Sequence, residues 1–364
     1  MAMFCMWKGF MKKLIPFIAL IPLVALALTP PFSFQLDCTI NSMFWVWMVF
    51  ASGFLTMLYF YQDVSKWLKL FILWCFVSCF LSNAPYISFT MFWTVIACAY
   101  YYALCRKIED WTPVYKAIQA IFLFIVILII MQQLGKDILL NFGQKNDITG
   151  TIGNKMIFSS FVCVLAPLLI VTPLNWLPLV ALSIVSSSSG AILSIGTGLA
   201  IWSWAKLTKK LRIIFIILAL LVPIIFAYKT GDMSTFFNAG RGPVWKKTIE
   251  LVAKRPLGYG IATYRVLFPV LCGEEISKQQ PGRAWLQAHN SWLQLPFEVG
   301  IVGSFLLLGW IISIVRKIKD PIKWAGIAIL SVNMLTAFPD RMCQSVLIIV
   351  MFLAYCERKE NEQV

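Results

Sequence analysis

The chain contains a single histidine, His289, and it stands beside polar residues whose spacing predicts a shared surface. If the run from Trp285 onward is helical, Asn290, Gln294 and Glu298 fall at i, i+4 and i+8 and form one polar stripe on an otherwise apolar helix. An unperturbed imidazole has a pKa of about 6.5, so it can accept a proton at physiological pH. A lone histidine at such a position can equally be a hydrogen-bonded structural residue, and so can the glutamate.

Three arginines, Arg241, Arg265 and Arg283, lie in the polar stretch that precedes and includes this site. A guanidinium group presents a planar, permanently charged fork that matches phosphate oxygens, and it stabilises the charge on a departing phosphate or diphosphate. Together with a base, these residues predict group transfer from a phosphate-bearing lipid to an acceptor hydroxyl. Each arginine can instead pair with lipid headgroups or acidic side chains. The candidate substrate contacts are Asn290, Gln294, Glu298, Trp245 and Trp292, although tryptophans here are also typical of an interfacial belt.

The composition places these residues in a membrane protein. Hydrophobic residues make up 60% of the chain and charged residues only 13%. Several apolar runs approach the roughly 20 residues that a helix needs to cross a bilayer. A net charge of +15 would suggest nucleic acid in a soluble protein. Most basic residues here lie in short loops between apolar runs, where they orient the protein, so we expect no nucleic-acid partner.

The fold class predicted is an all-α integral membrane protein with about 10–12 transmembrane helices and one large external loop that contains amphipathic helices. Spans are expected near residues 14–29, 42–61, 67–81, 88–104, 114–134, 155–171, 176–186, 190–205, 212–227, 294–315, 323–337 and 343–356.

The stretch 176–205 can be read as one long tilted helix or as two short helices hinged at Ser186–Gly190. With two helices, the basic cluster of residues 206–212 joins the other basic loops on one side of the membrane, which the positive-inside rule favours. A single helix would reverse this pattern. We therefore predict two helices and place both termini in the cytoplasm.

This topology divides the chain into four parts. Residues 1–134 and 135–227 hold the N-terminal and central transmembrane helices, 228–293 form the external loop with the candidate site, and 294–364 hold the last helices and a cytoplasmic tail. In the loop, Gly242-Pro243 opens a predicted helix with Val244, Trp245, Thr248, Ile249 and Val252 on its apolar face, expected to lie along the membrane surface. A glycine-hinged turn follows at 257–260, and Pro296 is expected to kink the helix that enters the membrane.

The order of these motifs resembles the O-antigen ligase and O-antigen polymerase superfamily of bacterial envelope glycosyltransferases. The resemblance rests on an arginine followed by tryptophan in Gly240–Trp245, a glycine-rich turn in Pro256–Gly260, and a His-Asn pair in His289–Gln294 that leads to Glu298-Val299-Gly300. Thr149–Asn154 is similar to the Gly-Thr-x-Gly-Asn turn of the family. The resemblance covers roughly residues 145 to 315, and the motifs are individually short.

One position departs from the pattern of the family. Members commonly carry an arginine in a Ser-Arg-Gly-Ala-like turn, and here Ser189 stands at that position in Ser188-Ser189-Gly190-Ala191. If that arginine helps to hold diphosphate, then Arg265 or Arg283 must substitute for it, or this chain uses a different donor or is impaired.

The resemblance implies a metal-independent transferase without a cofactor, located in the bacterial inner membrane and using an undecaprenyl-diphosphate-linked glycan as donor. His289 would accept the proton of an acceptor hydroxyl, while Arg241, Arg265 and Arg283 would neutralise the departing diphosphate. Asn290 or Glu298 would orient the histidine or the acceptor. The acceptor is lipid A–core in a ligase or another glycan in a polymerase, and the sequence does not separate these roles.

Two other functions compete with this one. A bundle of this size is also typical of a transporter or flippase for a lipid-linked glycan, but the central thirds of the predicted spans hold almost none of the ionisable residues that coupled transport uses. A catalytically inactive scaffold is the other alternative, and the missing arginine leaves it open. The predicted external side lacks a dense cluster of Asp, Glu and His residues. This absence argues against an essential divalent metal.

Overall fold

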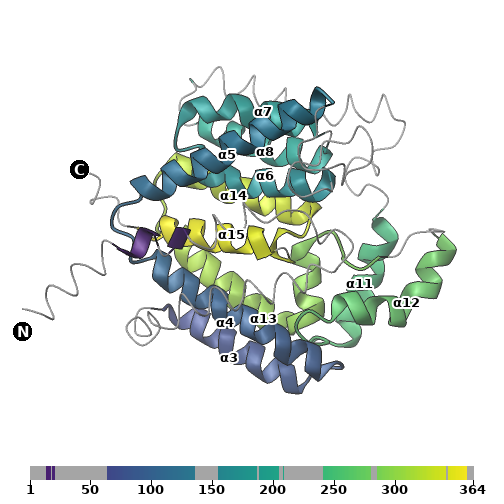
Figure 1. Ribbon diagram of the computed structural model, residues 1–364. Coiled ribbons are helices and arrows are strands. Elements are labelled where there is room, and N and C mark those ends of the chain that lie inside the picture. Colours follow the sequence, from purple (N-terminus) through teal and green to yellow (C-terminus); the bar gives the residue numbers. More distant parts are fainter. Residues whose placement is uncertain are drawn as a thin grey trace, which may run out of the picture.

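The structure of the chain is a computed structural model, and it describes residues 14–17, 19–20, 64–135, 155–186, 188–204, 208, 241–279, 285–341 and 343–358. Every regular element in these ranges is a helix. Figure 1 shows most of the helices packed side by side in a bundle, with α11 and α12 standing at one edge. The all-α membrane class predicted from the sequence is therefore confirmed.

Nine helices form the described part of the bundle, and two lie outside it. The bundle helices are α3 (Lys66–Phe80), α4 (Pro85–Cys105), α5 (Thr112–Gln133), α6 (Lys155–Leu169), α7 (Trp176–Val185), α8 (Ser189–Trp204), α13 (Ser291–Val315), α14 (Pro321–Thr336) and α15 (Cys343–Cys356). The other two are α11 (Gly242–Lys254) and α12 (Tyr264–Gln279), and short 3-10 turns occupy Pro173–Asn175 and Pro339–Arg341.

The lengths of the helices agree with a membrane bundle of unequal members. Among the described residues, α4, α5 and α13 are long and apolar enough to cross a bilayer, while α6, α7 and α15 belong to shorter apolar helices. The predicted spans at 42–61 and 212–227, and most of 14–29, lie outside the described residues.

Local sequence explains where several helices begin. Proline occupies the first turn of α4, α5 and α14, where its missing N–H and fixed φ cost nothing. Ser65 and Asp320 cap α3 and α14 by accepting hydrogen bonds from the N–H groups of Leu68 and Ile322. These helix starts lie within a few residues of the predicted starts of the spans at 67–81, 88–104, 114–134 and 323–337.

The two-helix interpretation of residues 176–205 is confirmed. Helix α7 ends at Val185 and α8 begins at Ser189, so the chain turns within the serine-rich stretch. Helix α8 packs closely on α14, because a Cβ added at Gly198 would lie 2.3 Å from the Ile329 side chain. Small residues at such contacts let helix backbones approach within the membrane.

Contacts between loops define two ends of the bundle. At one end, Arg106 Nε lies 2.7 Å from Glu357 Oε2. At the other end, the Asn83 N–H donates to the Tyr259 carbonyl at 3.0 Å. We call these the Glu357 end and the Glu298 end, after the buried glutamate at each. The predicted topology places the Glu357 end in the cytoplasm and the Glu298 end outside, and this orientation stays a prediction.

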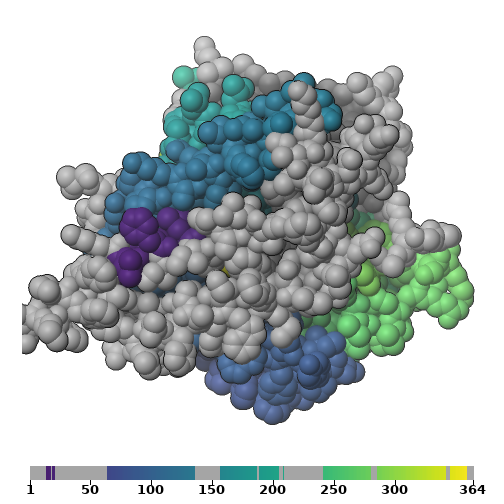
Figure 2. Space-filling view, viewed as in Figure 1, coloured from purple at the N-terminus to yellow at the C-terminus, as the bar shows by residue number. Residues whose placement is uncertain are grey.

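Helix α11 is amphipathic as expected, but it packs on protein. Val244 and Thr248 are fully buried, together with Leu251, which the apolar pattern had not included. Ile249 is 57% exposed, so it does not contribute to the protein contact of this helix. Helices α11 and α13 are in extensive contact, and the α12 surface lies at the edge of the molecule in the space-filling view (Figure 2). Placement of this edge along a membrane surface stays a prediction.

Candidate functional site

The helix that enters the bundle begins later than predicted. It starts at Ser291, and the side chain of Asn290 caps it by accepting a hydrogen bond from the Leu293 N–H at 3.1 Å. His289 precedes the cap with a φ of 51°, in the left-handed region, so it lies outside the helix. The expected polar stripe is therefore shorter: Gln294 and Glu298 share the helix face, while Asn290 serves as the cap.

Helix α13 is interrupted at Gly300, and not at Pro296 as predicted. Gly300 has φ 73° and ψ 177°, a backbone conformation that side-chain-bearing residues rarely adopt. The break leaves backbone groups without helical partners. The Tyr259 N–H donates to the Phe297 carbonyl at 2.8 Å, and the Gly260 N–H donates to the Glu298 carbonyl at 2.9 Å. The predicted glycine turn thus completes the broken helix.

Close approach of the two backbones requires glycine on both sides. A Cβ added at Gly258, where φ is 85°, would lie 2.4 Å from the Gly300 nitrogen. A Cβ added at Gly300 would lie equally close to the Leu257 carbonyl carbon, at 2.4 Å. The Ile301 N–H donates to the Pro256 carbonyl at 2.8 Å and closes the junction. The turn at 256–260 and α13 therefore hold each other in one arrangement.

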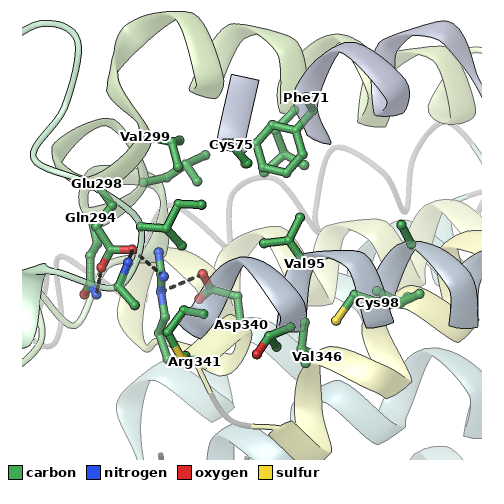
Figure 3. A pocket seen from close by; sticks show the side chains of 18 of the residues that line it. Phe71, Cys75, Val95, Cys98, Gln294, Glu298, Val299, Asp340, Arg341 and Val346 are labelled. Atoms are coloured by element: carbon green, nitrogen blue, oxygen red, sulfur yellow. Dashed lines mark hydrogen bonds and ion pairs between the residues drawn. The ribbon is translucent and has the colours of Figure 1, made fainter. Parts of the chain in front are cut away.

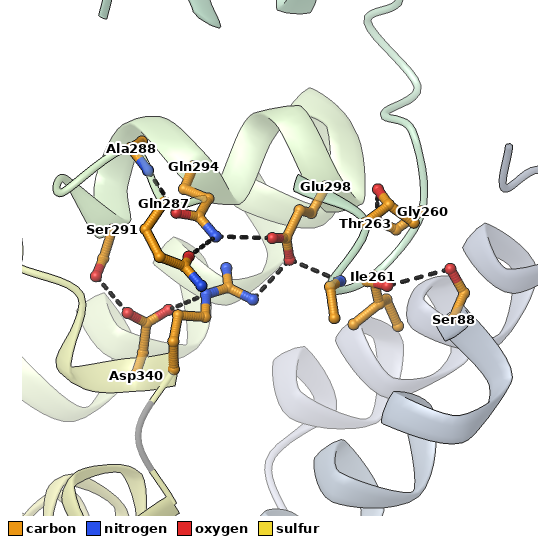
Figure 4. A network of polar contacts seen from close by, with 12 residues as sticks. Ser88, Gly260, Ile261, Thr263, Gln287, Ala288, Ser291, Gln294, Glu298 and Asp340 are labelled. Atoms are coloured by element: carbon orange, nitrogen blue, oxygen red, sulfur yellow. Dashed lines mark hydrogen bonds and ion pairs between the residues drawn. The ribbon is translucent and has the colours of Figure 1, made fainter. Parts of the chain in front are cut away.

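This junction positions Glu298, which is 1% exposed and makes three polar contacts. Arg341 Nη1 lies 2.6 Å from Glu298 Oε2, the Ala262 N–H donates to the same oxygen at 2.8 Å, and Gln294 Nε2 donates to Oε1 at 2.9 Å. Figure 4 shows these contacts meeting between α13, the turn that precedes α12, and the loop before α15. A buried carboxylate needs such partners, because desolvation otherwise disfavours its charge.

Further contacts extend this network toward His289. Gln294 donates through Nε2 to Gln287 Oε1 at 2.7 Å and accepts the Ala288 N–H at 3.0 Å through Oε1. Asp340 accepts a hydrogen bond from the Ser291 hydroxyl, and its Oδ2 lies 3.1 Å from Arg341 Nε. Gln294, predicted as a substrate contact, therefore holds the segment that carries the histidine.

Arg341 and Asp340 are the residues that sequence reasoning missed. Arg341 was counted only as a loop charge, and Asp340 was not singled out. The available signal was the Pro339-Asp340-Arg341 sequence between two apolar runs on the same predicted side as the histidine. Burial opposes the charge of the Arg341 guanidinium, but the carboxylates of Glu298 and Asp340 outweigh burial and raise its pKa.

His289 lies beside Arg241 in a partly buried aromatic setting. Arg241 Nη1 donates to the Thr336 carbonyl at 2.5 Å and to the His289 carbonyl at 3.4 Å. The imidazole meets the Trp285 and Phe338 rings edge-on, with centroids 5.5 Å and 4.9 Å away. Burial, together with the positive charge of Arg241, lowers the pKa of His289 to about 4. The imidazole is therefore neutral at physiological pH and keeps a lone pair for a proton.

The two predicted tryptophans support the backbone of this region. The Trp245 indole N–H donates to the Ala288 carbonyl at 2.8 Å, and the Trp292 indole N–H donates to the Ser331 carbonyl at 3.2 Å. Both indole N–H groups are thus used within the protein. The Ala288 peptide is held from two directions, by Trp245 on its carbonyl and by Gln294 on its N–H.

Of the other two predicted arginines, the structure describes Arg265 only. Arg265, in the first turn of α12, lines a cavity of about 260 Å³ that also includes Glu298, Gln294 and Arg341. Figure 3 shows this cavity, with the polar residues gathered at one end. Arg241 and His289 are not part of its lining. Arg283 lies outside the described residues.

The turn that contains the departure at Ser189 approaches a residue of α14 that Arg241 also contacts. A Cβ added at the following residue, Gly190, would lie 2.5 Å from Thr336 Oγ1, and the carbonyl of that threonine accepts the hydrogen bond from Arg241. The turn that carries Ser189 and the guanidinium of Arg241 therefore approach the same residue of α14.

Metal-ligating side chains do not cluster in the part of the chain that the structure describes: no group of three or more His, Cys, Asp or Glu side chains is placed to hold an ion. Independence from a metal remains a prediction from the sequence.

Residues 174–308 match the family model described as O-antigen ligase. This region of the chain is similar to the O-antigen ligase-like superfamily, and the match supports that resemblance. Members are O-antigen ligases or polymerases, which supports an enzyme of the membrane glycosyltransferase type. The matched region contains Arg241, Arg265, His289 and Glu298, whereas Arg341 lies beyond its end. Among curated proteins, no match is found.

Proposed function

We propose that this protein transfers a glycan from an undecaprenyl-diphosphate-linked donor to an acceptor hydroxyl at the outer face of the bacterial inner membrane. The observation that carries the proposal is the contact between a neutral, half-buried His289 and a buried Arg241 inside the region that is O-antigen ligase-like. A base and a fixed cation side by side are what this transfer requires.

In the proposed reaction, the acceptor hydroxyl oxygen attacks the anomeric carbon of the donor and gives its proton to the imidazole of His289. The bond between the anomeric carbon and the phosphate oxygen breaks, and the lipid diphosphate leaves with the bonding electrons. Arg241, with Arg265 and Arg283, stabilises the negative charge of the leaving group. Asn290 acts indirectly, by fixing the helix start beside the histidine.

The lowered pKa of His289 has two consequences for a base. It keeps the imidazole neutral, which is the form that accepts a proton. It also makes the unliganded imidazole a weak base. A bound diphosphate would place negative charge nearby and raise the pKa of His289 toward the working pH, because an opposite charge favours the protonated form. Donor binding would therefore activate the base.

Glycan transfer by purified protein in liposomes tests the proposal. The donor is an undecaprenyl-diphosphate oligosaccharide, EDTA is present throughout, and wild type is compared with His289→Ala. We expect the variant to lose at least about 100-fold in rate, the lower range for removal of a positioned base. Lys278→Ala, on the exposed end of α12, is the control that should retain full activity.

The products identify the reaction. A ladder of lengthened lipid-linked glycans would indicate a polymerase, and a single addition to lipid A–core would indicate a ligase. Retained transfer by folded His289→Ala would remove the histidine as the base. Movement of the donor across the liposome membrane without a new glycosidic bond would favour the transporter interpretation.

A further inference from the structure

The side chain of His289 is held between contacts with aromatic rings. The centroid of its imidazole lies 5.5 Å from that of the Trp285 ring and 4.9 Å from that of the Phe338 ring, with interplanar angles of 87° and 80°. Edge-to-face contacts have a preferred geometry, so they restrict the orientation of the imidazole. The hydrogen bond from Arg241 uses the backbone carbonyl of His289 and leaves the imidazole nitrogens unused.

The backbone that carries this imidazole is fixed separately. His289 has a φ of 51°, and the Ala288 peptide before it is held by Trp245 on the carbonyl and by Gln294 on the N–H. The cap formed by Asn290 fixes the chain after it. With the backbone fixed, the orientation of the imidazole depends on the two side-chain torsions of the histidine. Contacts made by the ring itself therefore decide where its nitrogens point.

Phe338 reaches the histidine from the segment between α14 and α15, and polar contacts on both sides of Phe338 fix that segment. Before it, the Thr336 carbonyl accepts a hydrogen bond from Arg241. After it, Asp340 accepts a hydrogen bond from the Ser291 hydroxyl at the start of α13. The phenyl ring is thus placed by the same contacts that hold the arginine and the helix beside the base, as a preorganised site requires. This segment lies beyond the region matched by the family model, which ends at residue 308.

We propose that Trp285 and Phe338 are positioning residues that orient the imidazole of His289 toward the acceptor hydroxyl. This inference rests on the proposed function, in which that imidazole takes the proton of the hydroxyl. In many enzymes a carboxylate or a backbone carbonyl orients the base histidine through a hydrogen bond to one ring nitrogen. Two aromatic rings orient the imidazole without engaging either nitrogen. One nitrogen then accepts the proton, and the other can donate its N–H to the bound substrate.

Substitutions that remove or keep a ring test the inference in the liposome transfer assay. Phe338→Leu and Trp285→Leu keep an apolar side chain without a ring. We expect each to lower kcat at least about ten-fold, part of the roughly 100-fold or more that a positioned base contributes, while KM changes less than about two-fold. Phe338→Tyr and Trp285→Phe keep a ring and should stay within about three-fold of the wild-type kcat.

Two features of the chain sharpen this comparison. The Trp285 indole N–H has no hydrogen-bond partner in the described part of the structure, so Trp285→Phe changes the ring without breaking such a bond. Phe305 on α13 makes an edge-on contact with Trp67, with centroids 5.9 Å apart, and is 63% exposed. Phe305→Leu is therefore the matched control, which removes an aromatic pair away from the site and should keep the wild-type kcat.

NMR of the imidazole gives a second readout that does not depend on transfer. The chain has one histidine, so protein in nanodiscs with isotope-labelled histidine gives a single imidazole signal. In wild type we expect an ordered ring with a pKa of about 4, because burial and the positive charge of Arg241 both lower the pKa of His289. Each leucine variant should show a mobile ring whose pKa moves up toward about 6.5 as water reaches it. The ring-keeping variants should match wild type.

The outcomes separate this inference from the proposed function. An imidazole that stays ordered in the leucine variants would overturn the inference, and so would a mobile imidazole with an unchanged kcat. If one leucine variant does not fold, the other decides, because each removes one of the two rings. Absence of transfer by folded wild type would overturn the proposed function, and the order of the imidazole would still decide whether the two rings hold it.

Discussion

Each end of the bundle buries a glutamate against an arginine, but the two networks differ in what they hold. Glu357 accepts the Tyr102 hydroxyl at 2.6 Å, lies 2.7 Å from Arg106 Nε and pairs with Lys317 at 3.1 Å. All of its partners are side chains at or just beyond helix ends. Glu298 instead binds a loop N–H group, a glutamine that holds the histidine segment, and an arginine that lines the cavity.

A buried ion pair therefore does not by itself mark a functional site. The Glu357 network ties helix ends together at the end where the predicted topology places the cytoplasm, and none of its members lines the described cavity. The Glu298 network joins a helix break, a turn with a left-handed residue at Ala262, and the cavity. Backbone strain and an adjoining cavity distinguish the two ends more clearly than charge does.

Matched substitutions of the two glutamates should give the largest contrast. Glu298→Gln leaves Arg341 buried with a weaker partner, and we expect transfer to fall by at least about 100-fold with a loss of about 3 kcal/mol in unfolding free energy. Glu357→Gln should lose about 1–3 kcal/mol, the range for a charge-assisted contact, while the folded protein keeps its transfer rate. Denaturant unfolding and the liposome assay measure both quantities.

Equal loss of transfer in the two variants at matched folded fraction would mean that the Glu298 network is structural like its counterpart. In that case the site would have to be sought at His289 and Arg241 alone.

The glycine junction should give the next largest effect. Gly300→Ala forces a Cβ into the Leu257 backbone at a positive φ. We expect the unfolding free energy to fall by about 2–4 kcal/mol and glycan transfer to be lost with it. Gly273→Ala in α12, where an added Cβ would approach only the Pro269 side chain at 3.9 Å, is the control and should be neutral or slightly stabilising. Wild-type stability in Gly300→Ala would show that α13 tolerates a continuous helix.

Acidification should give the smallest effect. The base must be neutral to accept a proton, and the pKa of His289 in the free protein is about 4. We therefore expect kcat/KM, which reports on the free enzyme, to change by less than about two-fold between pH 8 and pH 5. The midpoint of kcat should lie at higher pH, because the bound diphosphate raises the pKa of the histidine. A fall in kcat/KM centred near pH 6.5 would show that His289 is solvated in the working protein.

The sequence predicted the helices well because the bilayer imposes a simple requirement on each span. Apolar length and loop charge located α3 to α8, and charge alone separated α7 from α8. Prediction failed where tertiary contacts override helical spacing. His289 was placed inside a helix because its neighbours repeat every four residues, but the Asn290 side chain caps the helix after it.

The kink was assigned to Pro296 because proline is the usual local cause, yet the break at Gly300 depends on backbone partners some 40 residues away in the chain. The spacing of residues within α13 cannot predict hydrogen bonds to a turn elsewhere in the chain. Arg341 was missed for a similar reason, since its contact with Glu298 joins α13 to the 3-10 turn at Pro339–Arg341, and neither segment points to the other in the sequence.

The interrupted helix also constrains how the protein is made. The turn at 256–260 is synthesised before α13, and the carbonyl groups of Phe297 and Glu298 would lack partners in hydrocarbon until that turn binds them. The second half of α13, from Ile301 onward, needs no such partner to continue as a helix, whereas the first half completes its backbone hydrogen bonds only when the turn at 256–260 packs against it.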